Sequence, residues 1–233
     1  MPAPDHPSIH ERLKRNRQLR AAASPRDHAK RRFAAAVREI LDSLEASGAS
    51  ARFFDSETPR FVALAEELRA QPAEALEAKI EGYTGMENFH ERSPIVGLSN
   101  PLAPPAEIEL VPEEKAARGR VEFGKAFEGG PGLVHGGFLA ALLDEALGMV
   151  TIYSGTSGMT GEYTIRYHAP TRIKVPLHFE ARFDHREGRK LHVSADLWDG
   201  ETRTVSAKGL FIAVDAAKFE GFHEARRERI GER

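Results

Sequence analysis

Apolar residues recur at helical spacing through roughly the first hundred residues of the chain. They predict three amphipathic helices, which open at Ser24-Pro25, at Thr58-Pro59 and at Pro72, because proline is favoured near the first position of a helix. Their apolar positions are Phe33, Val37, Ile40, Leu41 and Leu44; Phe61, Leu64, Ala65 and Leu68; and Leu76, Ile80 and Tyr83. Each such face has to cover another apolar surface.

The period of the pattern changes to two after the proline-rich segment Asn100–Pro105, which can form neither a helix nor a central strand. Six strand-like stretches follow, and a long apolar helix near residues 135–153 separates the second from the third. The stretches are Ile108–Leu110, Val121–Lys125, Thr160–His168, Leu177–Phe183, Leu191–Leu197 and Val205–Ala213. Between the last two, Asp199-Gly200 is a strong two-residue hairpin turn.

The long helix is apolar on nearly every side, which predicts that it is buried. A curved antiparallel sheet wrapped around one central helix, the hotdog architecture, satisfies this pattern, and an ordinary α+β sandwich fits it almost as well. We therefore expect an α+β protein with a helical N-terminal extension at residues 1–95, a hotdog domain at residues 96–216 and a charged C-terminal tail at residues 217–233.

The composition narrows the possible partners and location. The chain has 233 residues, no cysteine and a formal net charge of −2, so thiol chemistry is excluded and nothing suggests nucleic acid as a partner. We expect no membrane span and no apolar signal peptide. Residues 12–32 are rich in Arg, Lys and Ala, as transit peptides are, and we interpret them instead as a solvated helix face or a frayed leader. The expected location is the cytoplasm. The histidines of the strand-like stretches do not cluster, so we expect no metal and no cofactor.

Candidate chemistry lies where a glycine-rich turn runs into the long helix, at residues 129–148. A helix N-terminus offers unpaired N–H groups and a partial positive charge, which suit an oxyanion. Glycines such as Gly130 and Gly137 let a ligand approach the backbone. The carboxylate of Asp144 interrupts an apolar stretch, and a buried charge is unfavourable unless it has a function. Glu145 points about 100° away from it and is interpreted as a polar seam residue.

The stretch from Phe127 to Asp144, with its Gly-Pro-rich loop, its His-Gly-Gly and an Asp nine residues after the His, resembles the signature of the PaaI-like acyl-CoA thioesterases of the hotdog superfamily. The prolines that follow Asn100 and the stretch from Thr160 to Pro170 are also similar to that family. The resemblance covers about residues 95–215 and leaves the N-terminal helices unexplained.

The resemblance implies roles for individual residues. The Gly136 N–H would polarise a thioester carbonyl, and His135 would orient the loop or bond near the substrate. Asp144 would be the general base or the nucleophile, and Thr160 would help to place the attacking water. The family's position for an Asn or Gln, six residues before the His, is occupied here by Gly129.

Other assignments remain open from the residues alone. Thr160 is nearly as well explained as an ordinary strand residue. Arg166 and Arg172 are candidates for the CoA phosphates because arginine suits phosphate geometry, although a solvated strand face explains them too.

The spacing of His135 and Asp144 constrains any site that they form. Nine residues of helix rise about 13 Å and turn the side chain by roughly half a revolution, so the two residues of one chain cannot both touch one thioester carbonyl. Either the motif is not a site, or the site is composite. A homodimer, or a dimer of dimers, gives a composite site, because a two-fold interface generates two identical sites.

The resulting hypothesis is an acyl-CoA thioesterase. The alternatives are a non-catalytic acyl-ligand binder and a hotdog hydratase or dehydratase. The N-terminal helices are expected to pack against the outer surface of the sheet or against the partner subunit and to cover one end of the acyl tunnel. The alternative for these helices is a separate interaction module.

Overall fold

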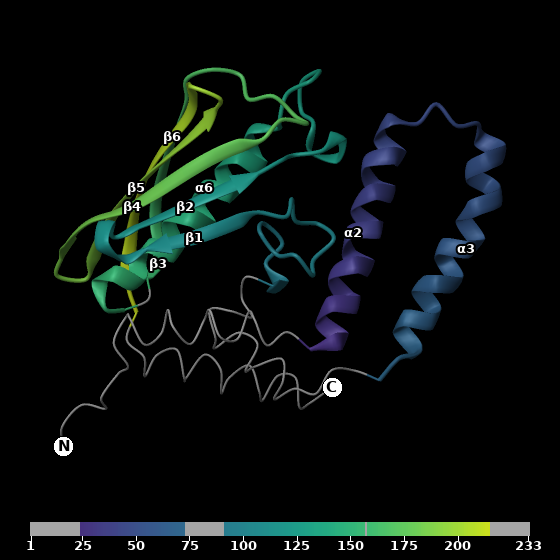
Figure 1. The fold of residues 1–233 in the computed structure, drawn as a ribbon, viewed down its shortest axis with the longest axis horizontal. Coiled ribbons are helices and arrows are strands. Elements are labelled where there is room, and N and C mark those ends of the chain that lie inside the picture. The colour runs from purple at the N-terminus through teal and green to yellow at the C-terminus, as the bar shows by residue number, and fades with distance from the viewer. Residues whose placement is uncertain (1–23, 73–90, 157, 215–233) are drawn as a thin grey trace.

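A six-stranded antiparallel sheet curves around one helix in the computed structural model, which describes residues 24–72, 91–156 and 158–214 (Figure 1). The helices are α2 (Pro25–Ala46), α3 (Ala51–Ala70) and α6 (Gly136–Val150), with short 3₁₀ turns η1 (Pro112–Glu114), η2 (Lys125–Phe127) and η3 (Thr151–Ser154). The strands are β1 (Glu107–Val111), β2 (Ala116–Val121), β3 (Gly158–Tyr167), β4 (Leu177–Glu187), β5 (Lys190–Asp199) and β6 (Thr202–Ala213).

The strand order is β1-β2-β4-β5-β6-β3, so β1 and β3 are the two edges of the sheet. The two-residue turn between β5 and β6 is formed by Gly200 and Glu201, one residue after the predicted Asp199-Gly200, because Asp199 still pairs with Thr202. Gly200 has φ of 59°. The arrangement of sheet and helix confirms the hotdog architecture with a helical N-terminal extension. The predicted second strand is displaced, because the chain leaves the sheet after Val121 and Lys125 begins η2.

The core lies between α6 and the concave face of the sheet. Leu142, Leu143 and Leu147 of α6 are fully buried. The facing strands contribute alternate residues, among them Phe179, Leu197, Val205 and Phe211. By length and composition alone, Gly136–Ser154 would pass as a membrane span, but 56% of that window is buried inside the fold. It is therefore the core helix of the sheet, as the apolar pattern predicted.

The helix α2 begins where the sequence indicates. Ser24 accepts a hydrogen bond from the Asp27 N–H, and the Asp27 carboxylate accepts one from the Ser24 N–H, which completes a capping box. The start predicted for the second helix is wrong. Helix α3 begins at Ala51, because Ser50 caps it, and Pro59 lies inside it.

Helix α3 continues through Pro59. A proline has no N–H to donate within the helix, so the C=O of Asp55, four residues earlier, loses its usual backbone donor. Nearby, Thr58 donates its hydroxyl to the C=O of Phe54 at 2.8 Å and Ser56 donates to the C=O of Phe53 at 2.8 Å. These side-chain bonds add to the turn before the proline, but neither reaches the carbonyl of Asp55.

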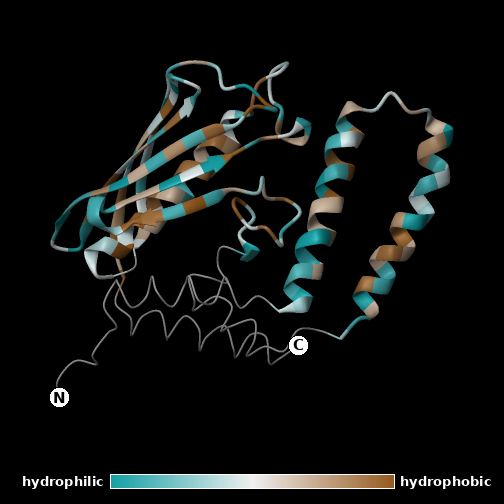
Figure 2. Cartoon of the chain, in the orientation of Figure 1, coloured by the Kyte–Doolittle hydropathy of each residue, from teal (hydrophilic) through white to brown (hydrophobic). Residues whose placement is uncertain are grey.

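The apolar face of α3 is exposed in the single chain, so the described part of this chain does not supply the apolar surface that its stripe was expected to cover. Phe61 and Leu68 are about half exposed, no residue of α3 is buried, and apolar residues stand out on this outlying helix in Figure 2. Phe33 of α2 is also exposed, and Leu41 is half-buried. The predicted third helix and the C-terminal tail from residue 217 lie outside the described residues.

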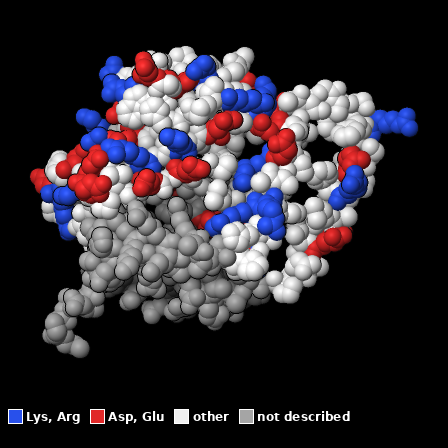
Figure 3. All heavy atoms as spheres, viewed as in Figure 1, with Lys and Arg blue, Asp and Glu red and all other residues white. Residues whose placement is uncertain are grey.

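Charges of both signs are interspersed over the visible face of the molecule (Figure 3). On that face, no extended basic stripe of the kind that binds nucleic acid is present among the described residues. This matches the small net charge of −2.

Replacing Leu147 with alanine should destabilise the protein by about 2–5 kcal/mol, because the side chain is fully buried and the change leaves a cavity between helix and sheet. Urea unfolding measures this loss. The matched control is Leu102→Ala, in an exposed loop, which should change the free energy of unfolding by no more than about 0.5 kcal/mol. Equal small effects would contradict the assignment of α6 as the core helix.

Candidate functional site

The N-terminus of α6 is capped by His135. Its Nδ1 accepts a hydrogen bond from the Gly137 N–H at 3.0 Å, so a neutral ring carries its proton on Nε2. His135 therefore orients the start of the helix, one of the two roles that the resemblance implied. The Gly137 amide, a predicted substrate contact, is already engaged by this cap.

The Gly136 N–H is the open donor at this helix start. No described residue accepts a hydrogen bond from it. Beside it, the Tyr167 O–H donates to the Gly136 C=O at 2.8 Å. A Cβ at Gly136 would lie 3.2 Å from that hydroxyl oxygen, so a side chain here fits only if Tyr167 gives way slightly. The result is an unpaired N–H at the positive end of a helix, beside a tyrosine.

The glycine-rich turn explains how this chain departs from the family pattern. A Cβ at Gly129, where some members carry Asn or Gln, would lie 2.8 Å from the Cα of His135. The loop is therefore too tight for any side chain at that position. Gly130 accepts from the Leu133 N–H at 2.9 Å, and Gly132 adopts φ of 74°, so the predicted contact residue Gly130 belongs to the turn itself.

Asp144 and Thr160, two residues singled out from the sequence, lie together. The Thr160 hydroxyl donates to Oδ1 of Asp144 at 3.0 Å. Asp144 is half-buried on α6, and Thr160 is exposed on the edge strand β3. This arrangement leaves Oδ2 of the carboxylate available to a water molecule or a substrate, since no bond to it is made by the described residues.

An irregularity in β3 places Thr160 on the helix side of the sheet. Thr160 pairs with Phe211 and Ile165 pairs with Ala207, and both partners face the core. In a regular strand, two residues five positions apart would lie on opposite faces. A register shift between Thr160 and Glu162 makes this possible, because one extra residue reverses the alternation. Without this bulge, Thr160 would not face Asp144.

Two tyrosines of β3 also bond to α6, and the sequence reasoning missed both. The Tyr163 O–H donates to the Ala140 C=O at 3.0 Å, and the Tyr167 O–H donates to the Gly136 C=O, one turn closer to the helix N-terminus. Burial raises the pKa of Tyr163, so it stays protonated as a donor at neutral pH. The two tyrosines are four positions apart, so they lie on the same face of the strand. The sequence alone does not tell which face that is, because the bulge reverses the alternation along β3.

Glu145 is more buried than expected for the polar residue of a partly exposed helix face, as which the sequence analysis interpreted it. Burial raises the pKa of this carboxyl, while a hydrogen bond with the buried Ser93 opposes the rise and the nearby Asp144 adds to it. Within the described part of the chain, its Oε1 has no hydrogen-bond partner. It therefore belongs to the interior side of α6, whereas Asp144 faces β3.

The two candidate phosphate-binding arginines lie apart. Arg172 donates through Nε and Nη2 to both carboxylate oxygens of Asp199, at 2.7 and 2.6 Å. This bidentate ion pair engages two of the guanidinium nitrogens of Arg172. The backbone of Arg172 forms an isolated β-bridge with Leu133 of the glycine-rich turn. Arg166 is paired with Ser206 on the outer face of the sheet, away from Asp144. The structure thus does not bring Arg166 to Asp144 and Thr160 within one chain.

Gly136 and Asp144, the two groups that the proposed chemistry requires, lie far apart within one chain. Gly136 and Asp144 both contact β3, but eight residues of helix place them about 12 Å apart along α6. One carbonyl carbon cannot meet both groups of the same chain. In the described ranges, no cluster of three or more His, Asp or Glu side chains is placed to hold a metal ion.

Comparison with known proteins identifies the family. The model of the thioesterase superfamily matches residues 131–206, which include Asp144 and Thr160. A crystal structure described as a thioesterase superfamily protein superposes with a TM-score of 0.70 at 31% identity, over 78% of this chain and 94% of its own. The chain belongs to the thioesterase superfamily. The match is longer than the hotdog unit, which spans about half of the chain, so it includes part of the N-terminal extension of this thioesterase-superfamily protein.

Curated relatives match this superfamily member over a shorter stretch. Bovine acyl-coenzyme A thioesterase THEM4 is 35% identical over 97 residues, which are 41% of this chain and 40% of the relative. Human acyl-coenzyme A thioesterase THEM5 is 29% identical over 109 residues, which are 46% and 44% of the two chains. The chain thus spans less than half the length of these relatives.

The pKa of Glu145 predicts a pH-dependent effect of Glu145→Gln. A carboxyl whose pKa is raised on folding stabilises the folded state below its ordinary pKa, near 4.5, and loses that contribution as the pH rises through the raised value. Glutamine stays neutral at every pH. Urea unfolding from pH 4 to 8 should therefore show the variant gaining stability relative to wild type as the pH rises. A difference that is constant with pH would contradict this assignment.

Proposed function

We propose that this chain is an acyl-CoA thioesterase that hydrolyses a CoA thioester to a free acid and CoA. The observation that carries the proposal is the Asp144 carboxylate, held by the Thr160 hydroxyl at 3.0 Å on the same helix whose N-terminus presents the open Gly136 N–H. The names of the curated relatives, acyl-coenzyme A thioesterases, support the same substrate class. Placement in the PaaI-like branch is part of the proposal and rests on the His-Gly-Gly and the Asp nine residues later.

The groups suit hydrolysis of a thioester. The Gly136 N–H and the partial positive charge of α6 stabilise the oxyanion that develops on the thioester oxygen. Asp144 either removes a proton from the attacking water or attacks the carbonyl carbon itself to give a mixed anhydride, which water then cleaves. In both routes CoA leaves as the thiol. Thr160 orients the carboxylate in both, and in the first it also lies near the water.

The site we propose is composite. Gly136 of one protomer and Asp144 of its partner meet the same carbonyl, because about 12 Å of helix separates the two groups within a chain. The edge strand β3, with Met159 and Tyr167 exposed, is the surface on which a second copy would bring the halves together. A homodimer then has two identical sites, and a dimer of dimers has four.

Thiol release from a panel of acyl-CoAs tests the function. The thioesterase proposal predicts free CoA and free acid in equal amounts with at least one substrate. Acyl-CoA binding without turnover would support the non-catalytic binder instead. Loss or gain of an acyl double bond, with the thioester intact, would support a hydratase or dehydratase.

Asp144→Asn should keep the shape of the side chain and remove the base. We expect kcat to fall by about 10²- to 10⁴-fold, the range for a general acid–base group. Glu145→Gln is the matched control, because it makes the same change at the neighbouring position and should lower kcat far less. Equal rates for the two variants, measured by thiol release, would mean that Asp144 is structural.

Gly136→Pro removes the proposed oxyanion donor and keeps a helix start. Proline is favoured at the first helical position, and His135, with φ −61° and ψ 129°, has the backbone conformation that a residue before proline prefers. We expect kcat to fall by about 10²- to 10³-fold, the effect of losing one oxyanion donor.

Gly136→Ala is the control for this experiment. It adds a Cβ against Tyr167, as proline does, but it retains the N–H. Its kcat should therefore stay well above that of the proline variant. If the two variants lost the same activity, crowding against Tyr167 rather than the N–H would explain the loss.

A further inference from the structure

A single carboxylate joins the N-terminal extension to the loop before the glycine-rich turn. Oδ1 of Asp42, on α2, accepts a hydrogen bond from the Ala126 N–H of η2 at 3.0 Å, across 84 residues of sequence. Its Oδ2 lies 3.8 Å from Nζ of Lys174. Asp42 is half-buried, so this bond is partly shielded from water.

The residue next to this contact is glycine for a steric reason. A Cβ at Gly124 would lie 2.1 Å from Oδ1 of Asp42, closer than any real contact. The backbone of Gly124 is extended, with φ of −79°, which other residues adopt freely. The missing side chain is therefore explained by the approach of Asp42 and not by the conformation of the loop.

The segment that Asp42 holds is bonded directly to the start of α6. The His135 N–H donates to the Phe127 C=O at 2.9 Å, and the Gly132 N–H donates to Oε1 of Glu128 at 2.6 Å. The ring of Phe127 also meets that of Phe138, on the first turn of α6, edge to face with centroids 5.0 Å apart. A shift of η2 would therefore move the cap and the Gly136 N–H.

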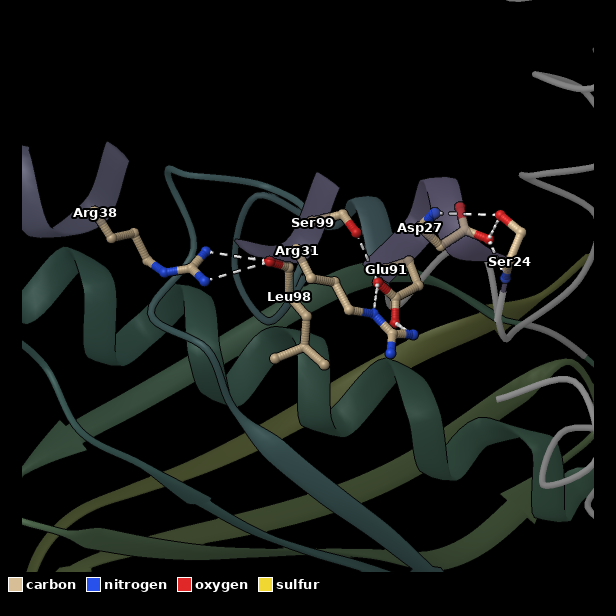
Figure 4. A network of polar contacts seen from close by, with 7 residues as sticks. All are labelled: Ser24, Asp27, Arg31, Arg38, Glu91, Leu98 and Ser99. Atoms are coloured by element: carbon tan, nitrogen blue, oxygen red, sulfur yellow. Dashed lines mark hydrogen bonds and ion pairs between the residues drawn. The ribbon is translucent and has the colours of Figure 1, made fainter. Parts of the chain in front are cut away.

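Helix α2 is itself anchored, so it can act as a fixed support. Arg31 forms a bidentate ion pair with Glu91, in which Nε lies 3.1 Å from Oε2 and Nη2 bonds to Oε1 (Figure 4). The Ser99 hydroxyl donates to the same carboxylate. Arg38 donates to the C=O groups of Leu98 and Asn100. These contacts bind two turns of α2 to the segment before β1, upstream of the Asp42 contact.

We propose that Asp42 is a positioning residue: through its bond to Ala126 it holds η2, and through η2 it fixes the position of the Gly136 N–H. The proposal rests on the proposed function only for the role of that N–H. It gives α2 a part in the site, although none of the candidate site residues lies on α2. Sequence motifs gave no sign of this role.

Three full-length variants test the proposal with an acyl-CoA that the wild type hydrolyses. Asp42→Ala removes the acceptor and should lower kcat by about 10- to 100-fold with KM within about two-fold, since a small misplacement of an aligned group is enough. Asp42→Asn retains an oxygen that accepts from Ala126 and should restore kcat to within about three-fold of wild type. Glu45→Ala, at an exposed acidic position on the same helix, is the control and should match wild type.

Hydrogen–deuterium exchange on the same variants supplies a readout that needs no activity. Amides from residues 125–137 should exchange about 10-fold faster in Asp42→Ala than in wild type, which is the effect of losing one hydrogen bond to a charged acceptor. In Glu45→Ala their exchange rates should equal those of wild type. Unaltered kcat and exchange in Asp42→Ala would overturn the proposal, as would an asparagine variant that is as impaired as alanine. If the wild type hydrolyses no acyl-CoA, the proposed function fails, and the exchange result still decides whether Asp42 holds the loop.

Discussion

The burial of α6 inside the curved sheet is the constraint on which the rest of the structure depends. Leu142, Leu143 and Leu147 are fully enclosed, so the helix cannot bend or slide without opening the core. A rigid helix fixes the distance between its N-terminus and its carboxylate at about 12 Å. The same packing that makes the domain stable therefore prevents one chain from applying Gly136 and Asp144 to a single carbonyl.

The contacts between β3 and α6 show where prediction from the sequence succeeds and where it ends. Periodicity located five of the six strands and the buried helix, and the His-Gly-Gly with Asp144 indicated a candidate site. The sequence could not decide whether Thr160 is a site residue or an ordinary strand residue. The face on which it lies depends on one extra residue in β3, which the hydrophobic pattern does not reveal. The same bulge hid Tyr163 and Tyr167, whose hydroxyl groups bond to carbonyls along α6.

The N-terminal region shows a second limit. Ser24 identified the start of α2 correctly, since capping is local chemistry. Pro59 misled the prediction for α3, because Ser50 caps the helix eight residues before Thr58 and the proline lies inside it. The contact of Asp42 with Ala126 spans 84 residues, so it depends on tertiary packing alone. Helix α2 thus supports the loop before α6, whereas the apolar face of α3 remains exposed in the single chain.

The central claim is that two chains complete each site, and subunit mixing tests it most directly. Gly136→Pro and Asp144→Asn each disable both sites of a homodimer, but a mixed dimer retains one intact Gly136 facing one intact Asp144. After unfolding and refolding together in equal amounts, the two inactive variants should regain about a quarter of the wild-type rate of thiol release, because half the dimers are mixed and each has one working site. A mixture no more active than the two separate variants would contradict the composite site.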